Sequence, residues 1–388
     1  MSITLQHKRD TASNWTSNNP TLAAGQFGFE TDTGKLKLGD GSTAWSSLNY
    51  FEPTIVPWAY QGENYGYTAG GNNDNPWAKI DVVDKFPFSS DSNATDVGDL
   101  TVARGGGGGL SSETDGYAAG GDTWSPSYPY YGRKNIVDKT PFSSDANMTD
   151  VGDLQGTKFG GVGSASSSEN GYLFGGCGSP APTGPGGHSQ EQIDKFPFSG
   201  TFSITDVGDL SHDSPTSTCY TLESAGVTSS THGYRAGGMY SLIGSTKLDK
   251  FSFSSDGNAT DVGDLTDAIY GASGTSSSDA GYVSGGRQYS APVSQTKVQC
   301  TPFASDTGTT CVGALVQGQH YGAASQSSTT AGYATAGSLP FTGTPITAGN
   351  IIQKFPFSAE GNSTDVGDLT CARGNNVGGC GMGFHYSE

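Results

Sequence analysis

The stretch Lys85-Phe86-Pro87-Phe88, followed after seven residues by Asp96-Val97-Gly98-Asp99-Leu100, is a unit that the chain repeats with variations. A Gly-Tyr motif, first found at Gly66-Tyr67, also occurs six times. The second Phe of the first motif recurs at intervals of about 50–56 residues, as Phe88, Phe142, Phe198, Phe253, Phe303 and Phe357. Repeats of this length indicate one small supersecondary unit that is stacked many times.

Each repeat predicts four short strands. In the unit that spans residues 100–154, these are residues 102–110, 116–121, 136–142 and 149–154, with Ser-, Asp- and Asn-rich turns between them. No part of the unit has a helical period. Four short antiparallel strands in about 50 residues are typical of one propeller blade. We therefore expect an all-β fold in which a six-bladed β-propeller occupies residues 53–388.

The order of these motifs resembles kelch-type repeats, in part. Kelch blades usually carry a Trp where this chain has Val97, and Arg104 and Arg373 have Lys158 as a counterpart but no equivalent in the middle repeats. The resemblance therefore implies a kelch-like propeller. We expect the Gly-Tyr strand near the crowded axis, where small residues let backbones approach, and the Phe pair between neighbouring blades.

The two motifs are out of phase, which suggests how the repeats join. The first Gly-Tyr strand, residues 65–71, lacks a Gly-rich strand before it, and residues 370–381 have that strand's pattern without a partner. We predict that these segments pair, so that a C-terminal strand closes the ring and removes the open sheet edges. Residues 382–386 then look like the remnant of a seventh Gly-Tyr motif. A linear solenoid is the alternative, and it leaves both edges bare.

Composition limits the function. The chain has 388 residues, 60 of them Gly, only 14% charged residues and a net charge of −18. Regular aromatic and aliphatic positions favour a folded protein, and the negative charge excludes nucleic acid as an expected partner because phosphate binding needs clustered cations. Residues 1–9 lack the apolar region of a signal peptide, and we expect no membrane insertion. The six Cys form no Cys-x-x-Cys motif and are expected to be free thiols.

The first 52 residues do not belong to the repeat. Residues 26–31 and 35–38, joined by Asp32-Thr33-Gly34, predict a β-hairpin. A segment this short with few apolar groups is marginally stable alone, so oligomerisation is the expected remedy.

This segment also resembles a small module found at the N-terminus of bacteriophage tail fibres and tropism determinants. The resemblance implies a β-rich virion-attachment and trimerisation module at residues 1–52, a homotrimer and a location on the virion. The motifs that carry it are Leu5-Gln6-His7-Lys8-Arg9-Asp10-Thr11-Ala12, Asn14-Trp15-Thr16, Asn19-Pro20, Leu22-Ala23-Ala24-Gly25-Gln26-Phe27-Gly28-Phe29-Glu30-Thr31-Asp32 and Lys37-Leu38-Gly39-Asp40-Gly41, with Trp45 and Leu48.

The loop after each double Gly differs in every repeat and is rich in aromatic residues. Exposed aromatic rings suit stacking against sugar rings, and loops on rigid scaffolds often bind ligands. The alternative is that these side chains cover a blade edge or contact a partner subunit. The candidate ligand-binding residues are Trp77, Trp124, Tyr128, Tyr130, Tyr131, Tyr240, Tyr289 and Phe341.

A second candidate site lies on the opposite side of the repeat. Asp91, Asn93, Asp96 and Asp99 offer oxygen ligands that could hold Ca²⁺. The same residue types form turns by bonding their own backbone. We favour turns, because the fifth repeat reads Cys311-Val312-Gly313-Ala314 and loses the carboxylates without losing the repeat. The Asn-x-Thr pattern at Asn93 has the same simple explanation.

Catalysis has little support in the sequence. The chain has no Gly-x-Ser-x-Gly elbow, His-Glu-x-x-His motif or P-loop. We therefore expect a non-enzymatic phage fibre or spike subunit, without a cofactor, whose propeller binds a host-surface glycan or protein receptor and whose other partners are phage tail or head proteins. The alternatives are a head-surface decoration fibre, a structural virion spacer, and a polysaccharide depolymerase whose acid pair converges from distant positions.

Overall fold

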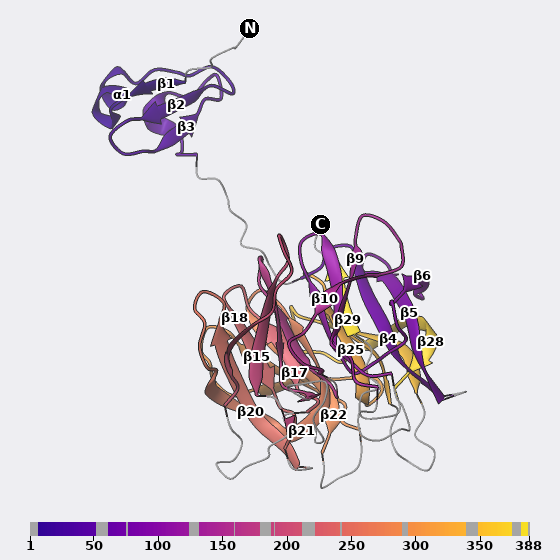
Figure 1. Ribbon diagram of the computed structural model, residues 1–388. Helices are drawn as coiled ribbons and strands as arrows, with labels where there is room; N and C mark the ends of the chain where they lie inside the picture. Colours follow the sequence, from indigo (N-terminus) through magenta and orange to yellow (C-terminus); the bar gives the residue numbers. More distant parts are fainter. Residues whose placement is uncertain are drawn as a thin grey trace. The chain divides into compact units, whose positions relative to one another are not determined.

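The computed structural model divides the chain into two compact units, Met1–Pro57 and Trp58–Glu388 (Figure 1). The boundary predicted at residues 52 and 53 falls, like the boundary of these units, among residues that the structure does not describe, and it stays a prediction. The structure describes residues 7–51, 61–74, 77–123, 132–158, 160–178, 188–189, 191–211, 222–240, 243–288, 294–338, 348–374 and 382–386.

The N-terminal unit is a three-stranded sheet with one short helix. Strand β2 (Phe27–Glu30) pairs in parallel with β1 (Lys8–Asp10) and antiparallel with β3 (Leu36–Leu38), which confirms the predicted hairpin. Helix α1 (Ala12–Asn18) begins after Thr11, whose side chain accepts a hydrogen bond from the Asn14 N–H, and η1 (Trp45–Ser47) is a 3₁₀ turn. The small core consists of Leu22 and two tryptophans, Trp15 and Trp45, whose stacked ring centroids lie 4.2 Å apart.

The C-terminal unit consists of six four-stranded antiparallel arrays, and the described residues of this unit contain no helix (Figure 1). Strand β21 belongs to two arrays, because residues 260–269 pair with β20 and residues 270–276 pair with β22. From the innermost strand outwards, the arrays are β29 (Met382–Tyr386), β4 (Tyr65–Asp74), β5 (Trp77–Pro87) and β6 (Thr95–Asp99); β7 (Gly108–Ser111), β8 (Asp115–Ala119), β9 (Ile136–Pro141) and β10 (Thr149–Asp153); β11 (Gly163–Ser166), β12 (Asn170–Phe174), β15 (Gln192–Pro197) and β16 (Thr205–Asp209); β17 (Ala225–Thr228), β18 (His232–Ala236), β20 (Ile243–Ser252) and the first part of β21 (Thr260–Ser276); the second part of β21, β22 (Ala280–Arg287), β23 (Lys297–Pro302) and β24 (Thr310–Ala314); and β25 (His320–Ser327), β26 (Ala331–Ser338), β27 (Gly349–Pro356) and β28 (Thr364–Arg373). Short strands β13 (Cys177–Gly178) and β14 (His188–Ser189) pair with each other, and β19 (Met239–Tyr240) pairs with β20.

The innermost strands pack backbone against backbone. Each contacts the innermost strand of the next array, and β29 contacts both β7 and β25. A Cβ added to Gly109 would lie 2.2 Å from the Gly383 carbonyl oxygen, and one added to Gly383 would lie 2.3 Å from the Ser325 carbonyl oxygen. Only Gly or Ser is therefore found at the centre of these strands. The six central residues are Gly109, Ser164, Gly226, Gly274, Ser325 and Gly383.

A chain of hydrogen bonds links the ends of these strands. The hydroxyl of Ser111 accepts from the His385 N–H at 3.0 Å, and the His385 Nδ1 accepts from the Ser327 N–H at 3.4 Å. The Ser327 hydroxyl accepts in turn from the Ser276 N–H at 2.9 Å. Further links of this kind join Ser111 N–H to Ser166 Oγ and Thr228 N–H to Ser276 Oγ. His385 thus stands where the other strands carry a hydroxyl residue, and its burial lowers its pKa to about 3.

Aromatic residues fill the space between neighbouring arrays, which confirms the predicted position of the Phe pair. The Tyr of each Gly-Tyr motif packs on the second Phe of the next repeat, as Tyr282 does on Phe357 with ring centroids 4.7 Å apart. The Gly before the Tyr is needed because the first Phe of its own array covers it: a Cβ on Gly332 would lie 2.4 Å from the Phe355 ring. The Tyr–Phe pairs are Tyr67–Phe142, Tyr117–Phe198, Tyr172–Phe253, Tyr234–Phe303, Tyr282–Phe357 and Tyr333–Phe88.

Two sequence expectations about these strands are wrong in detail. The C-terminal strand that pairs with β4 is Met382–Tyr386, whereas residues 370–373 extend the outer strand β28. The Gly-Tyr strand is second in each array, and the Gly-rich strand before it is innermost. Both errors have one physical cause, because closest backbone approach needs a small residue at one central position and not a run of them.

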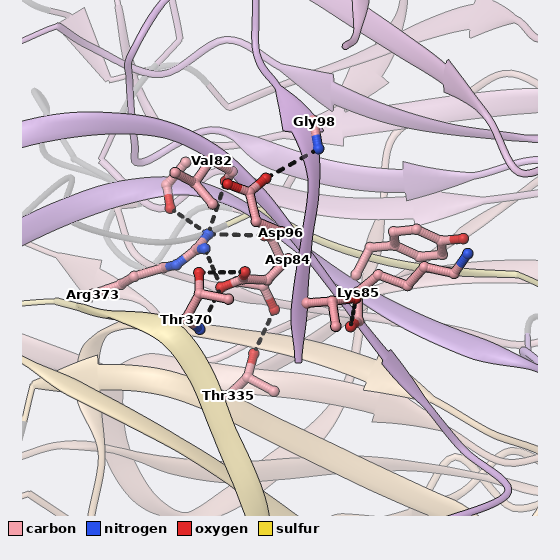
Figure 2. Close-up of polar contacts among 12 residues, drawn as sticks. Val82, Asp84, Lys85, Asp96, Gly98, Thr335, Thr370 and Arg373 are labelled. Carbon is pink, nitrogen blue, oxygen red and sulfur yellow. Dashed lines mark hydrogen bonds and ion pairs between the residues drawn. The ribbon is translucent and has the colours of Figure 1, made fainter. Parts of the chain in front are cut away.

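A buried ion pair joins the end of β28 to the first array of the repeat. The Arg373 guanidinium contacts the Asp84 carboxylate, and both side chains have no exposed surface (Figure 2). Arg373 also donates to the carbonyl oxygens of Thr68, Gly70 and Val82 at 2.8–3.1 Å. The Thr370 hydroxyl donates to Asp84 at 2.6 Å. The carboxylate and the guanidinium are therefore satisfied by several partners, as burial of a charge requires.

Equivalent positions keep this charge balance or lose it as a pair. Buried pairs join Arg104 to Asp138 at 2.7 Å and Lys158 to Asp194 at 3.3 Å. Burial lowers the pKa of Lys158 and raises that of Asp194. Asp249 takes its partner from another strand, Arg235 of β18, at 2.8 Å. The two remaining arrays have neutral Gln299 and Gln353 in place of the Asp, with Ile269 and Gln319 in place of the cation.

We expect Arg373→Ala to lower the free energy of unfolding by about 3–5 kcal/mol, because it leaves the buried Asp84 carboxylate uncompensated. The double variant Arg373→Gln/Asp84→Gln imitates the neutral repeats and should recover most of this loss. Lys354→Ala, which removes an exposed pair with Asp91, is the control and should cost less than about 1 kcal/mol. Denaturant unfolding of the full chain measures all three, and a double variant as unstable as Arg373→Ala would contradict the prediction.

His385 should make stability depend on pH. Its folded pKa of about 3 lies below the unfolded value, so the unfolded state binds the proton first, and stability present above pH 6.5 is lost as pH falls towards 3. Between pH 7 and pH 4 this amounts to about 3 kcal/mol. His385→Ser places a hydroxyl where other repeats have one, and it should remove this component while the titration of all other groups stays in common. Equal pH dependence of the two proteins in denaturant unfolding would contradict the assignment.

Candidate binding surfaces

Only two of the eight predicted aromatic ligand-binding residues fall on described residues. Trp77 begins β5, and Tyr240 ends β19. Both follow a double Gly at the end of the second strand of their arrays. The other candidates, Trp124, Tyr128, Tyr130, Tyr131, Tyr289 and Phe341, lie outside the described residues. The loops that carry them connect the second strand to the third, so they leave their arrays at the same end, but no described contact tests the predicted site.

The four candidate calcium ligands make other bonds. Asp91 accepts from the Lys354 ammonium group at 3.0 Å, and Asp96 accepts from the Gly98 N–H at 3.2 Å within its own turn. Desolvation, with repulsion from Asp81 and Asp96, raises the pKa of Asp99. The residues described in the structure include no group of three or more His, Cys, Asp or Glu that could hold a metal ion. These contacts favour the turn interpretation over the calcium site.

The Asn of the Asn-x-Thr pattern joins neighbouring arrays at their outer rim. The Asn93 side-chain oxygen accepts from the Asp368 N–H at 3.0 Å, and that of Asn147 accepts from the Asp99 N–H at 3.1 Å. Asn258 and Asn362 repeat this bond to the backbone of Asp209 and Ala314. These oxygens satisfy backbone donors of an outer strand, so the pattern has a structural role in each of the four copies.

The N-terminal unit exposes an apolar face on its sheet, formed by Phe27, Phe29, Leu38 and Phe51. Phe29 is 37% exposed, Leu38 38% and Phe51 42%, whereas their strand neighbours Glu30 and Lys37 are buried. The Lys37 ammonium group donates to the Trp45 carbonyl oxygen at 2.9 Å. The polar side chains therefore turn towards the small core, and the apolar ones turn outwards. This inversion is the usual sign of a surface that another molecule covers.

Sequence reasoning missed one residue with an unusual environment, Glu223. It lies at the start of the innermost strand β17 and is 2% exposed. The corresponding residues of three other arrays are Gly106, Gly161 and Gly271, so an alignment of the repeats is the signal that could have found it.

No helix of the described part of the chain is long and apolar enough to cross a membrane.

Comparison with known proteins identifies the N-terminal segment. Residues 5–43 match the family model of the major tropism determinant N-terminal domain. A hyaluronoglucosaminidase of Streptococcus pyogenes phage H4489A is 44% identical over 48 residues, which is 12% of this chain and 13% of that protein. A hyaluronoglucosaminidase of Streptococcus pyogenes phage H10403 is 39% identical over 51 residues, 13% of this chain and 15% of that protein. These matches thus cover only a small part of either chain.

Proposed function

We propose that this protein is a subunit of a bacteriophage fibre or spike, in which the N-terminal unit attaches to the virion and trimerises and the C-terminal unit contacts the host surface. The observation that carries the proposal is the match of residues 5–43 to the N-terminal domain of a phage tropism determinant. Two phage proteins carry a similar segment ahead of different sequence, which supports a module shared among virion proteins. The protein is then exposed on the particle, with other tail or head proteins as partners.

The C-terminal unit, in this proposal, is a six-bladed kelch-like propeller closed by its C-terminal strand. Three sets of contacts support closure: β29 pairs with β4, the innermost strands contact one another through to β7, and Arg373 reaches Asp84 of the first array. Arrays joined in this way leave no innermost neighbour without a partner. A linear solenoid would lack the contacts of β29 with β7 and of Tyr333 with Phe88.

The apolar face of the N-terminal unit supports self-association. Phe29 and Leu38 are exposed on a sheet whose own core holds few apolar side chains. Burial of such side chains stabilises by roughly 1.5–3 kcal/mol each. A homotrimer in which three copies of this face meet gives a small unit the core that it lacks alone.

Host recognition, in this proposal, uses the loops between second and third strands, because they differ between repeats while the strands are constrained by packing. Their aromatic side chains suit a glycan, whose ring faces stack on Trp and Tyr. The net charge of −18 disfavours adhesion through anionic groups and leaves specific contacts as the means of binding.

A polysaccharide depolymerase is the second candidate, favoured by the names of the two phage relatives. Their similarity to this chain covers about 50 residues, so the activity in the names is not carried by the matched segment. Incubation of the full chain with capsular polysaccharide or hyaluronan, followed by an assay of new reducing ends, separates the two: release supports the enzyme, and none supports binding alone. A head-surface decoration fibre or structural spacer is separated by antibody labelling of the particle, since a tail-tip location opposes both.

We expect the full chain to be a trimer and Phe29→Asp to be a monomer, because a charge in the apolar face must be desolvated on association. Ser13→Asp, at an exposed position of α1, is the matched control and should stay trimeric. Sedimentation velocity measures the mass of each. A trimer that survives Phe29→Asp, or a trimer after removal of residues 1–57, would refute the assignment of the oligomerising surface.

Trp124→Ala combined with Tyr130→Ala should reduce binding to host cells by about tenfold or more, since each lost stacking contact is worth roughly 1 kcal/mol. Val316→Ala is the control, because Val316 is an exposed apolar residue of the same unit outside the candidate loops. Adsorption of labelled protein to cells measures the difference. Unchanged adsorption of the double variant would count against recognition through these loops.

A further inference from the structure

A cavity of about 70 Å³ lies among the innermost strands of the C-terminal unit. Its walls are mainly backbone, because small residues line it, among them Gly109, Gly226 and Gly274. A cavity of this size holds several water molecules or a partly hydrated ion. Glu223, Ser224 and Ser273 bring polar side chains to the same lining.

The Glu223 carboxyl group is buried without a hydrogen bond. Neither Oε1 nor Oε2 has a partner among the described residues, and the side chain is in a residue only 2% exposed. Its backbone is held on both sides, since its N–H donates to the Gly160 carbonyl oxygen and its carbonyl oxygen accepts from the Gly271 N–H, each at 2.8 Å. The main chain is therefore fixed while the acid lacks the partners that buried carboxylates normally have.

Glu223 occupies a position that favours glycine. Its φ is +56°, and the corresponding residues Gly106, Gly161 and Gly271 have φ of +78°, +72° and +66°. A side chain strains this left-handed backbone, and such strain persists chiefly at functional sites. A glycine would fit here as it does in the neighbouring arrays, so packing alone does not explain the acid.

Charge makes the same position unusual. Burial raises the pKa of Glu223 well above its ordinary value, and the positive charge of Arg287, on β22, acts in the opposite direction. The hydroxyl groups of Ser224 and Ser273 also lack hydrogen-bond partners in the described structure. One carboxylate, two hydroxyls and a wall of backbone carbonyl oxygens make a set of hard oxygen donors.

We propose that this cavity binds a hard cation of calcium size, with the Glu223 carboxylate as its charged ligand and Ser224, Ser273, backbone carbonyl oxygens and water as neutral ligands. Calcium accepts six to eight such oxygens in flexible geometry, whereas magnesium demands a stricter arrangement. The ion balances the buried charge and ties together the arrays whose backbones Glu223 bridges. This site is separate from the rim residues Asp91, Asn93, Asp96 and Asp99, and it does not depend on the proposed host recognition.

The test compares thermal unfolding of the full chain after EDTA treatment, with and without CaCl₂ at pH 8, against NaCl of equal ionic strength. We expect CaCl₂ at one hundred times Kd to raise Tm by about 3–6 °C in the native protein and not in Glu223→Gln. Glu169→Gln, which neutralises an exposed acid, is the matched control and should respond like the native protein. Without calcium, Glu223→Gln should melt above the native protein, because it removes an uncompensated buried charge.

Glu223→Gly is the second variant, since it installs the residue of the neighbouring arrays and relieves the strained φ. It should fold and show no calcium response. An equal calcium shift in the native protein and in either Glu223 variant would overturn the proposal, because the shift would then come from surface acids. Absence of any calcium shift in the native protein would also overturn it and would leave Arg287 as the balancing charge.

Discussion

The close approach of the innermost strands is the constraint on which the C-terminal unit depends. A single side chain larger than that of Ser at Gly109, Gly226 or Gly383 would strike the backbone of the neighbouring strand. Because these residues are small, hydroxyl groups and carbonyl oxygens of one array reach the backbone of the next. The arrays therefore join through directional hydrogen bonds at the centre and through aromatic packing farther out, and both kinds of contact repeat with the same period as the sequence.

Charge balance is conserved from repeat to repeat even where the residues are not. A buried Asp has a buried cation beside it in four arrays, and in the other two both partners are neutral. Removal of one charge alone leaves the other desolvated, so the two positions are coupled physically. Asp249 makes the point most clearly: its sequence counterpart of Arg104 is Ser214, and Arg235 from a different strand supplies the charge. The same rule makes the lone buried acid Glu223 exceptional.

The scaffold and the surfaces proposed for function use different residues. The Lys-Phe-Pro-Phe and Asp-Val-Gly-Asp motifs, which are most regular, are engaged in packing, turns and rim bonds such as that of Asn147 to Asp99. The candidate loops vary, and little of the packing constrains them. In the N-terminal unit, the apolar face is separate from the stacked pair of Trp15 and Trp45 that forms the core. Change in loops or face can therefore proceed without loss of the fold.

The sequence by itself determined the repeat, its four strands, the N-terminal hairpin and the position of the Phe pair, because local turn chemistry and strand period are written in consecutive residues. It could not decide which strand is innermost, which C-terminal segment pairs with β4, or which way the hairpin turns its apolar side chains. Nor could it show that Glu223 lines a cavity. These features depend on contacts such as Arg373 with Asp84, between residues 289 positions apart, and only the packed tertiary structure brings such groups together.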